Sequence, residues 1–552
     1  YQGGSHRLDW TVDEFRPYVV HRFADGSKDW LFDGFLFLEF KDGSGRNYTV
    51  GYEKLNARRT EWEWLLDRIF EQGKSLSALD RCIGQEIKEL GKPAFRHQIV
   101  LGLPEAIRGQ KDWGEIDGRE MDFSKDEDQI AATKWYIGEL VERFKAAKYK
   151  HLELSGFYWV AEDTHHCAEL TIPLSEYIHS EGKLFYWIPY WQAKGHEDWK
   201  RLGFDVAYQQ PNHFFNKSIP DSRLDEACAV ARKNGMAMEF EFDERATIAA
   251  PDTFYDRMLA YIDRFEKNDV FNASAVAYYC GNRGVLTLFE SNEHKDKVIM
   301  DRLARIIYTR QVMKYGLPVK NKTRVVAHRG FWHTDGSAEN SVSSLLNADK
   351  LGAYGAEFDV WMAADGKLVI HHDDKHGSYE MEKNPSTVLT TLELANGEKI
   401  PTLEQYLQAA RKTKLELVLE VKPHATPEAD AEAVRKIVEM IGKYGLTKRV
   451  TYISFSFHAL KELVRVAPAK TPIMYLGGGT LPEDLKKMGM TGCDFNYWVF
   501  QNNPTWLHSI KWLKMASNVW TVNNPVEMLW VIENGFDFIT TDRPDLFLRL
   551  VR

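Results

Sequence analysis

The C-terminal part of the chain, from about Thr323 onward, alternates short apolar runs with stretches of helical periodicity. Such runs indicate buried parallel strands, and the stretches between them indicate helices that cover the sheet. We expect strands at Arg324–Ala327, Gly355–Trp361, Lys367–His371, Leu415–Val421, Val450–Phe455, Pro472–Leu476, Asp494–Tyr497, Ser517–Thr521 and Phe536–Thr540. Helices are expected at Ser341–Leu351, Thr402–Lys412 and Pro427–Tyr444. Repeated strand–helix units of this kind predict a (β/α)8 barrel.

The N-terminal part has the same rhythm, so we expect a second barrel there. Eight candidate strands are Tyr18–Phe23, Phe32–Phe40, Gln98–Leu103, His151–Trp159, Lys183–Trp191, Phe204–Gln210, Gly235–Phe242 and Ala273–Cys280. Helical patterns fill most gaps, and Trp62–Leu90 is expected to be a helical insertion. The prediction is therefore an α/β chain of two TIM-type barrels in tandem: residues 1–316, a linker at 317–322 and residues 323–552.

Length, charge and cysteines narrow the function classes. A chain of 552 residues exceeds what one core normally supports, which agrees with two domains. The net charge is −9 and no dense basic block is present, so nucleic acid is not an expected partner. Five scattered cysteines without CxxC spacing argue against a disulfide framework and a zinc site. No apolar run approaches the ~18 residues of a membrane span.

Charged and imidazole side chains follow the C-terminal strands in a regular order. Glu357 and Asp359 are two residues apart on one strand, so their carboxylates project to the same face, and Glu420 ends another strand. Three carboxylates without cysteine make a hard oxygen site that favours Mg²⁺ or Ca²⁺. His328 and His372 at strand ends suit general acid and base catalysis. Arg329 and Lys422 would suit a phosphodiester.

These motifs, taken together, resemble the glycerophosphodiester phosphodiesterase family. They are His328-Arg329-Gly330, Glu339-Asn340, Glu357-Phe358-Asp359, His372-Asp373 and Glu420-Val421-Lys422, with Val519-Trp520-Thr521 and Thr541-Asp542-Arg543-Pro544 in the tail. The resemblance implies a barrel that cleaves a glycerol-type phosphodiester. It also implies that His328 and His372 are the acid/base pair and that Glu357, Asp359 and Glu420 hold one divalent cation. Arg329, Lys422, Glu339, Asn340 and Trp520 are the expected substrate- or phosphate-binding residues.

Two departures from the family pattern concern the substrate. Residues 374–379 replace the Thr-rich stretch that commonly follows the His-Asp pair, which leaves the alcohol of the substrate open. His371 directly precedes His372, and the choice of His372 rests on alignment with that pair.

The N-terminal part resembles an uncharacterised domain family often described as glycosidase-like. Glu162 follows the fourth expected strand, and Glu239 and Glu241 lie on the seventh. Barrel active sites form at the carboxyl ends of strands, so Glu162 and Glu241 are the first candidates for the acid/base and nucleophile of a retaining glycosidase. Trp159, Trp187 and Trp191 are candidate sugar-stacking residues. Glycan binding without catalysis and a purely structural role remain the alternatives.

The sequence thus predicts a two-barrel hydrolase that acts on a small or glycan-linked glycerophosphodiester. The alternatives are a lyase that stops at a cyclic phosphate, and a carbohydrate-binding protein or glycosidase whose phosphodiesterase part is secondary. The chain starts at Tyr1 without a signal-peptide pattern, and we expect an exported protein whose targeting segment is not part of this chain.

Overall fold

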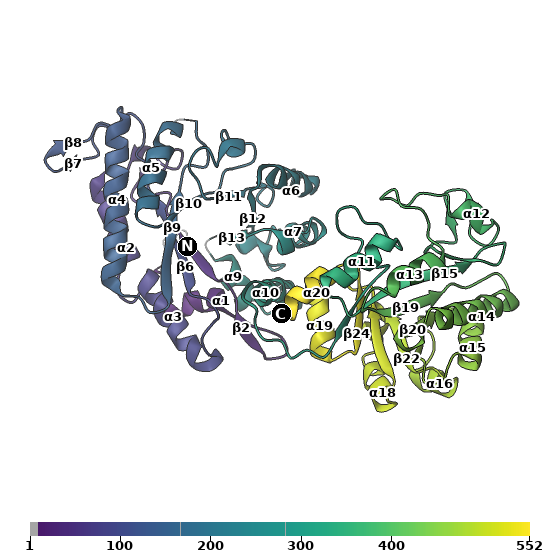
Figure 1. The fold of residues 1–552 in the computed structure, drawn as a ribbon. Helices are drawn as coiled ribbons and strands as arrows, with labels where there is room; N and C mark the ends of the chain where they lie inside the picture. Colours follow the sequence, from purple (N-terminus) through teal and green to yellow (C-terminus); the bar gives the residue numbers. More distant parts are fainter. Residues whose placement is uncertain (1–8, 166, 282) are drawn as a thin grey trace. The chain divides into compact units, whose positions relative to one another are not determined.

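The computed structural model describes residues 9–165, 167–281 and 283–552, which divide into two compact units, 1–310 and 311–552 (Figure 1). Helix α10, His294–Tyr315, runs across this division and ends before Gly316. No described helix has the length and apolar character needed to cross a membrane.

The C-terminal unit is a closed barrel of eight parallel strands. The strands are β14 (Arg324–Ala327), β15 (Gly355–Met362), β19 (Glu416–Val421), β20 (Val450–Ser454), β21 (Ile473–Tyr475), β22 (Gly492–Asn496), β23 (Ala516–Trp520) and β24 (Phe538–Thr541). Each pairs with the next, and β14 pairs with both β24 and β15, which closes the ring. Apolar side chains from four strands fill its interior: Val326, Val418, Ile453 and Met474, with Leu476 just beyond β21. The expected barrel is confirmed for this unit.

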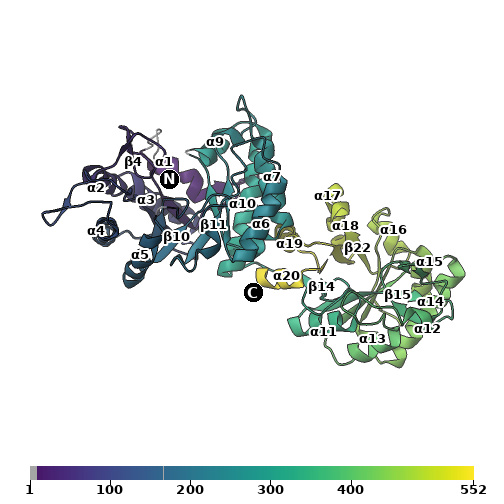
Figure 2. The ribbon, with the colours of Figure 1, turned by 90° about the horizontal axis from the view of Figure 1, so that it is seen from above.

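Helices surround the C-terminal barrel (Figure 2). They are α11 (Val342–Leu351), α12 (Ser386–Leu389), α13 (Leu403–Ala410), α14 (Pro427–Lys443), α15 (Phe457–Val466), α16 (Pro482–Lys487), α17 (Tyr497–Asn502), α18 (Trp506–Trp512), α19 (Pro525–Asn534) and α20 (Pro544–Leu550). Their starts follow local rules: Ser341 and Thr402 accept backbone hydrogen bonds as N-caps, and Thr426 does so before Pro427.

One expected C-terminal strand is not a parallel member of the barrel. Residues Leu368–Ile370 form β16, which pairs antiparallel with β15 through a turn at Gly366. An apolar run carries no information about strand direction, and the short connection between the two strands permits only a hairpin. A second hairpin, β17 (Lys375–His376) with β18 (Tyr379–Glu380), occupies the stretch that departs from the family pattern.

The N-terminal unit contains an open parallel sheet of seven strands. In spatial order they are β13 (Val276–Tyr279), β12 (Ala237–Glu241), β11 (Val206–Gln209), β10 (Leu184–Trp187), β9 (Leu152–Trp159), β6 (His97–Leu103) and β3 (Gly34–Phe37). The described residues include no ladder between β3 and β13, although Phe32 and Tyr278 bring their rings to 5.2 Å. A second closed barrel is therefore not confirmed.

The missing eighth strand has a local cause. Residues Val12–Val19 form helix α1, and only Val20–Arg22 is a strand, β1, which pairs antiparallel with β2 (Lys28–Trp30) in a separate sheet. The capping box of Thr11 and Glu14 starts the helix, so local capping outweighs the apolar run that suggested a strand at Tyr18–Phe23.

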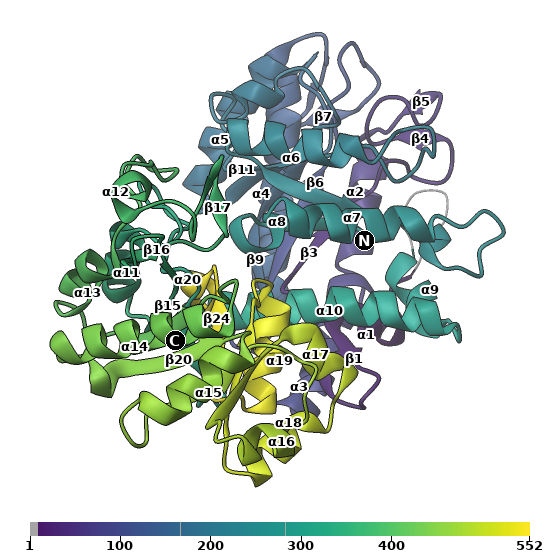
Figure 3. The same cartoon turned by 90° about the vertical axis from the view of Figure 1, so that its right-hand side faces the viewer.

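The remaining N-terminal helices alternate with the strands. They are α2 (Arg59–Ile69), α3 (Ser75–Leu90), α4 (Asp126–Ala147), α5 (Ala168–Ser180), α6 (Ser222–Asn234), α7 (Tyr255–Lys267), α8 (Val270–Ala273) and α9 (Gly284–Glu290). Helices α6 and α7 pack on β12, and Figure 3 shows these two helices side by side. Short strands also pair outside the sheet: β4 (Arg46–Asn47) with β5 (Leu55–Asn56), and β7 (Glu115–Ile116) with β8 (Arg119–Glu120). The helical insertion expected at Trp62–Leu90 is two helices, α2 and α3.

Candidate active site

Three buried carboxylates meet at the carboxyl ends of β15 and β19. Phe358 packs against Tyr406 of α13, with ring centroids 4.5 Å apart, so its neighbours Glu357 and Asp359 point to the opposite, inner face of the strand. The ladder pairs Asp359 with Glu420. One oxygen from each of the three carboxylates lies within 4.8 Å of the other two. The structure thus brings the three expected metal ligands together.

Polar neighbours hold these carboxylates in place. The backbone N–H of Arg329 donates to Glu357 Oε2 at 2.9 Å, and Asn340 Nδ2 donates to Asp359 Oδ2 at 2.8 Å. Lys422 Nζ lies 3.2 Å from Asp359 Oδ1 and 3.0 Å from Glu420 Oε1. One ammonium group therefore faces two of the three carboxylates.

The electrostatics of the group favour an additional positive charge. Burial and then the charge of Asp359 raise the pKa of Glu357 well above its usual range, and the same causes raise the pKa of Glu420 to about 8. Burial alone would also raise the pKa of Asp359, yet Lys422 and His372 together hold it at about 2. The three carboxylates repel one another and offer only oxygen atoms as ligands, which suits a hard divalent cation.

Each expected catalytic histidine has a carboxylate partner at one ring nitrogen. His328 Nδ1 lies 2.8 Å from Asp542 Oδ1, and its Nε2 lies 3.9 Å from Glu357 Oε2. His372 Nδ1 lies 2.6 Å from Asp373 Oδ1. A carboxylate at Nδ1 favours the tautomer that leaves Nε2 free to exchange a proton.

The adjacent His371 has different contacts. Its Nε2 lies 3.1 Å from His376 Nδ1 in the β17–β18 hairpin, and its Nδ1 lies 3.0 Å from the carbonyl oxygen of Asp373. Both of its ring nitrogens are thereby engaged within the loop. Burial lowers the pKa of both His371 and His372, and the charge of Asp359 opposes this in both, so both imidazoles lie within electrostatic reach of the acidic group.

The expected binding residues lie around the same mouth. The Arg329 guanidinium pairs with Glu339 and lies 4.0 Å from Asp359 Oδ2. Trp520, at the end of β23, donates from Nε1 to the Asp494 carbonyl at 3.0 Å, and its ring meets Phe455 edge-on at 5.8 Å.

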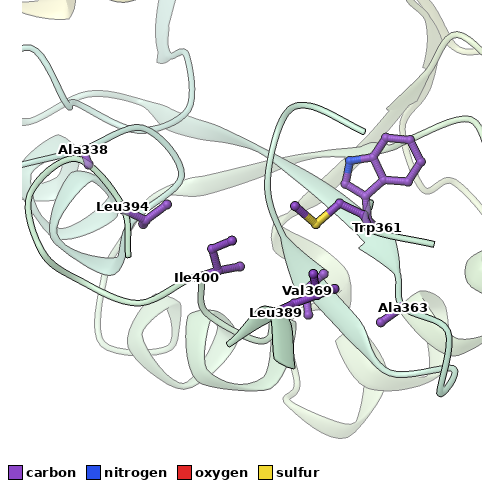
Figure 4. Close-up of a cluster of buried hydrophobic side chains, with 8 residues drawn as sticks. Ala338, Trp361, Ala363, Val369, Leu389, Leu394 and Ile400 are labelled. Atoms are coloured by element: carbon purple, nitrogen blue, oxygen red, sulfur yellow. The ribbon is translucent and has the colours of Figure 1, made fainter. Parts of the chain in front are cut away.

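A cleft of about 590 Å³ opens beside His371 and His372. It is lined by the segment after β14, the segment after β16 and the loop at 394–395, including Trp332, Glu339, Asn340, His371, His372 and His376. Two further lining residues, Ala338 and Leu394, belong to a buried cluster with Trp361, Val369 and Ile400 (Figure 4). The wall of the cleft therefore rests on a packed hydrophobic layer.

Two of the N-terminal stacking candidates are core residues instead. Trp187 is fully buried, donates from Nε1 to the Ala161 carbonyl at 2.8 Å and stacks on Phe204. Trp159 is 2% exposed and packs edge-on against Phe185. Both side chains thus contribute to the hydrophobic core, and the expectation of a stacking floor at these two positions is wrong. Trp191 is half-buried, with the Arg223 guanidinium 4.7 Å from its ring centroid.

The N-terminal carboxylates differ in their surroundings. Glu162 Oε1 accepts from Gln210 Nε2 at 3.1 Å. Glu241 accepts from the backbone N–H of His213 at 3.1 Å and from the hydroxyl of Tyr261 on α7. Glu239 is 5% exposed, and no donor or cation among the described residues bonds to its carboxylate.

The sequence assigned no role to two residues of these sites. Asp542 was part of the tail motif only, although it follows β24 directly and the rule that places functional residues after barrel strands indicates it. Gln210 carries no such signal, because an isolated Gln after a strand is common and its bond to Glu162 joins residues 48 positions apart.

Comparisons with known proteins agree with the division of the chain. A family described as the glycerophosphoryl diester phosphodiesterase family matches residues 328–546, and one described as a domain of unknown function (DUF4855) matches residues 1–305. A glycerophosphodiester phosphodiesterase of Caldanaerobacter subterraneus subsp. tengcongensis is 28% identical over 244 residues, which is 42% of this chain and 98% of the relative.

Two solved structures are also similar. A glycerophosphodiester phosphodiesterase from Parabacteroides distasonis is 45% identical, over 42% of this chain and 98% of that one, with a TM-score of 0.41. An Oleispira antarctica phosphodiesterase in complex with the product sn-glycerol-3-phosphate is 24% identical. The match covers 41% of this chain and 96% of that one, with a TM-score of 0.37.

Proposed function

The chain belongs to the glycerophosphodiester phosphodiesterase family through residues 328–546 and to the DUF4855 family through residues 1–305, and from this premise we propose how its barrel performs the reaction. The C-terminal unit is a phosphoric diester hydrolase. In our proposal a divalent cation at Glu357, Asp359 and Glu420 and the two histidines His328 and His372 cleave a glycerophosphodiester. The observation that carries the proposal is that the three carboxylates converge beside two histidines, each of which has a carboxylate at its Nδ1.

The donor set supports Mg²⁺ or Ca²⁺ at this position. All three side chains offer oxygen, and Lys422 offsets only part of their charge. When bound, the cation would neutralise negative charge on the phosphate and polarise its P–O bonds. Arg329 would then bind a phosphate oxygen after giving up its pairing with Glu339.

The histidines supply the proton transfers. One of His328 and His372 takes the proton from the attacking hydroxyl, and the other gives a proton to the leaving alkoxide. In a glycerol diester the attacking group can be the neighbouring hydroxyl, which gives a cyclic phosphate that water opens in a second step. A lyase would stop after the first of these steps.

The test uses the full chain and a set of glycerophosphodiesters, with ³¹P NMR as the readout. Cleavage should vanish with excess EDTA and return when Mg²⁺ or Ca²⁺ is restored. His328→Ala and His372→Ala should each lower turnover by about 10²–10⁴-fold, the contribution of one general acid or base. Full activity after exhaustive chelation would rule out the cation. A dead His371→Ala together with an active His372→Ala would reverse the choice between the two histidines. A cyclic phosphate as the final product would identify a lyase.

A glycan is the second part of the proposal. We infer that residues 1–310 bind or trim a glycan carried by the phosphodiester, so that a glycosylated glycerophosphate is the joint substrate. This rests on aromatic side chains exposed on loops that follow the parallel strands: Tyr52 after β3, Tyr190 after β10 and Phe215 after β11. Binding of neutral oligosaccharides to the full chain, measured by calorimetry, tests it. Tyr52→Ala should weaken that binding, and no binding of any tested glycan would refute it.

A further inference from the structure

The three N-terminal carboxylates lie at one edge of the sheet for a topological reason. Glu162 follows β9, and Glu239 and Glu241 belong to β12, so all three lie at or near carboxyl ends of parallel strands. Phe240 packs against Tyr261 and Phe265 of α7. Because side chains alternate along a strand, Glu239 lies on the face of β12 opposite Phe240, and its charge acts on the buried Tyr158 of β9.

The three carboxylates differ in whether other residues of the protein hold them by hydrogen bonds. Glu241 joins the end of β12 to α7 and to the loop at His213, and these two hydrogen bonds give it a structural role. Asp243, a fourth acid nearby, forms a bidentate ion pair with Arg245, whose Nε donates to Oδ1 and whose Nη2 donates to Oδ2. Glu239 has no such partner among residues 9–165, 167–281 and 283–552, although it is only 5% exposed.

An unpartnered buried acid costs stability, so its presence indicates a function. Burial, followed by the charges of Glu241 and Glu162, raises the pKa of Glu239 well above its usual range. Burial likewise raises the pKa of Glu162, and the hydrogen bond from Gln210 opposes this. No Lys, Arg or His of the described residues forms an ion pair with either carboxylate, which disfavours an anionic ligand.

Aromatic rings surround the edge where these acids lie. Tyr52 stacks flat on Phe40, with centroids 4.6 Å apart, and remains 45% exposed, so one ring face is open to solvent. Burial and, after it, the Glu162 carboxylate raise the pKa of Tyr52 to about 12, which places its hydroxyl near that acid. Tyr190 and Phe215 are 38% and 40% exposed on neighbouring loops. Flat apolar faces beside hydroxyl-binding acids suit the faces of a sugar.

We propose that Glu162 and Glu239 are the two carboxyl groups of a glycoside-hydrolysing site that accepts a neutral oligosaccharide. The assignment extends the glycan handling proposed above for residues 1–310, and it replaces Glu241 by Glu239. Glu239 gives its proton to the glycosidic oxygen while the bond from that oxygen to the anomeric carbon breaks. The Glu162 carboxylate takes a proton from the water whose oxygen forms the new bond to that carbon, which yields a free sugar and an alcohol, and exchange with solvent returns the two carboxyl groups to their starting protonation states.

The test measures release of 4-nitrophenol from 4-nitrophenyl glycosides of neutral pentoses, hexoses and deoxyhexoses in both anomeric forms. The full chain should cleave at least one of them. Glu162→Gln and Glu239→Gln should each lower kcat/KM for that glycoside by about 10²–10⁴-fold. Glu153→Gln, an exposed position at the start of β9, is the matched control and should cleave it normally.

Glycerophosphodiester cleavage by the same preparations separates this site from the phosphodiesterase, because it should be unchanged in all three variants. Cleavage of none of the glycosides by the parent chain would overturn the proposal, as would full activity of Glu162→Gln or Glu239→Gln. Loss of glycoside cleavage in Glu241→Gln at an unchanged melting temperature, with Glu239→Gln still active, would overturn the choice of Glu239.

Discussion

At the residue scale, the two histidines differ in how firmly their partners are held. Asp542 accepts from Asn523 Nδ2 at 2.7 Å as well as facing His328, and its side chain is 20% exposed. Asp373, the partner of His372, has a side chain that is 68% exposed. Solvent screens the second pair more than the first, so His328 depends more strongly on its carboxylate.

Asp542 is therefore a positioning residue whose loss should affect proton transfer. Asp542→Asn keeps the size of the side chain but no longer favours the proton on Nδ1 of His328, and we expect kcat to fall by about 10²-fold. Cation affinity, measured by calorimetry, should be unchanged, and the pH profile of kcat should move. Asp373→Asn is the comparison variant, and it should lower kcat less than Asp542→Asn does. Equal, small losses in both variants would contradict a positioning role for Asp542.

A second prediction at the residue scale concerns the unpartnered acid Glu239 and how it changes the stability of the fold with pH. In the unfolded chain a Glu ionises near its ordinary pKa, about 4.3. The folded pKa is raised, so the folded state binds more protons above that pH, and Glu239 destabilises the fold increasingly as the pH rises toward the folded pKa.

Glu239→Gln cannot ionise, so it should melt at a higher temperature than the parent chain at pH 8, with a difference that shrinks toward pH 4.5. Differential scanning calorimetry at the two pH values measures this, and Glu153→Gln should show no such trend. A difference that stays constant with pH would mean that the charge of Glu239 is not the cause.

At the element scale, the carboxyl ends of the C-terminal strands were predictable and the packing of the N-terminal strands was not. The alternation of side chains along β15 is enough to place Glu357 and Asp359 on one face, because that alternation is a property of any strand. The same reasoning suggested that Trp159 and Trp187 face a ligand, but strand periodicity does not say which face of a parallel sheet lies under helices. Both faces of such a sheet are apolar, so the sequence cannot distinguish the core from the cleft.

The turn after β14 has a steric requirement that the pattern of apolar residues does not reveal. Gly330 has φ +76°, and a Cβ there would lie 2.3 Å from Ser344 Oγ and 2.6 Å from the Ser344 backbone carbon. An alanine would thus strain the backbone and push the loop away from α11, which moves Arg329 and its hydrogen bond to Glu357.

Gly330→Ala should therefore lower the free energy of unfolding by about 1–3 kcal/mol and reduce phosphodiester cleavage. Gly352→Ala is the matched control, because Gly352 also has a positive φ, +88°, but a Cβ there meets nothing within 4 Å. Thermal unfolding and activity of the two variants separate backbone strain from the steric clash. Similar behaviour of both variants would show that the contact with Ser344 is unimportant.

At the scale of the whole molecule, each unit has its own sheet, its own hydrophobic core and its own candidate site. The division into two α/β units was predictable from the rhythm of apolar runs, because that rhythm reflects burial under helices in both parts. Closure of a barrel was not predictable. It depends on whether the first and last strands pair, as β14 and β24 do, whereas the described residues of β3 and β13 form no ladder.

Two complete cores predict that the catalytic unit folds and works alone on small substrates. A fragment of residues 311–552 should cleave a small glycerophosphodiester with the kcat/KM of the full chain, because all residues of the proposed cation and histidine site lie within it. A glycan-linked diester should be cleaved less efficiently by the fragment, since the full chain would bind it through two sites joined in one molecule. Kinetics of the fragment and the full chain on both substrates measure the effect. An equal loss on the small and the glycan-linked substrate would point to a folding defect of the fragment, whereas no loss on either would mean that residues 1–310 do not contribute to substrate capture.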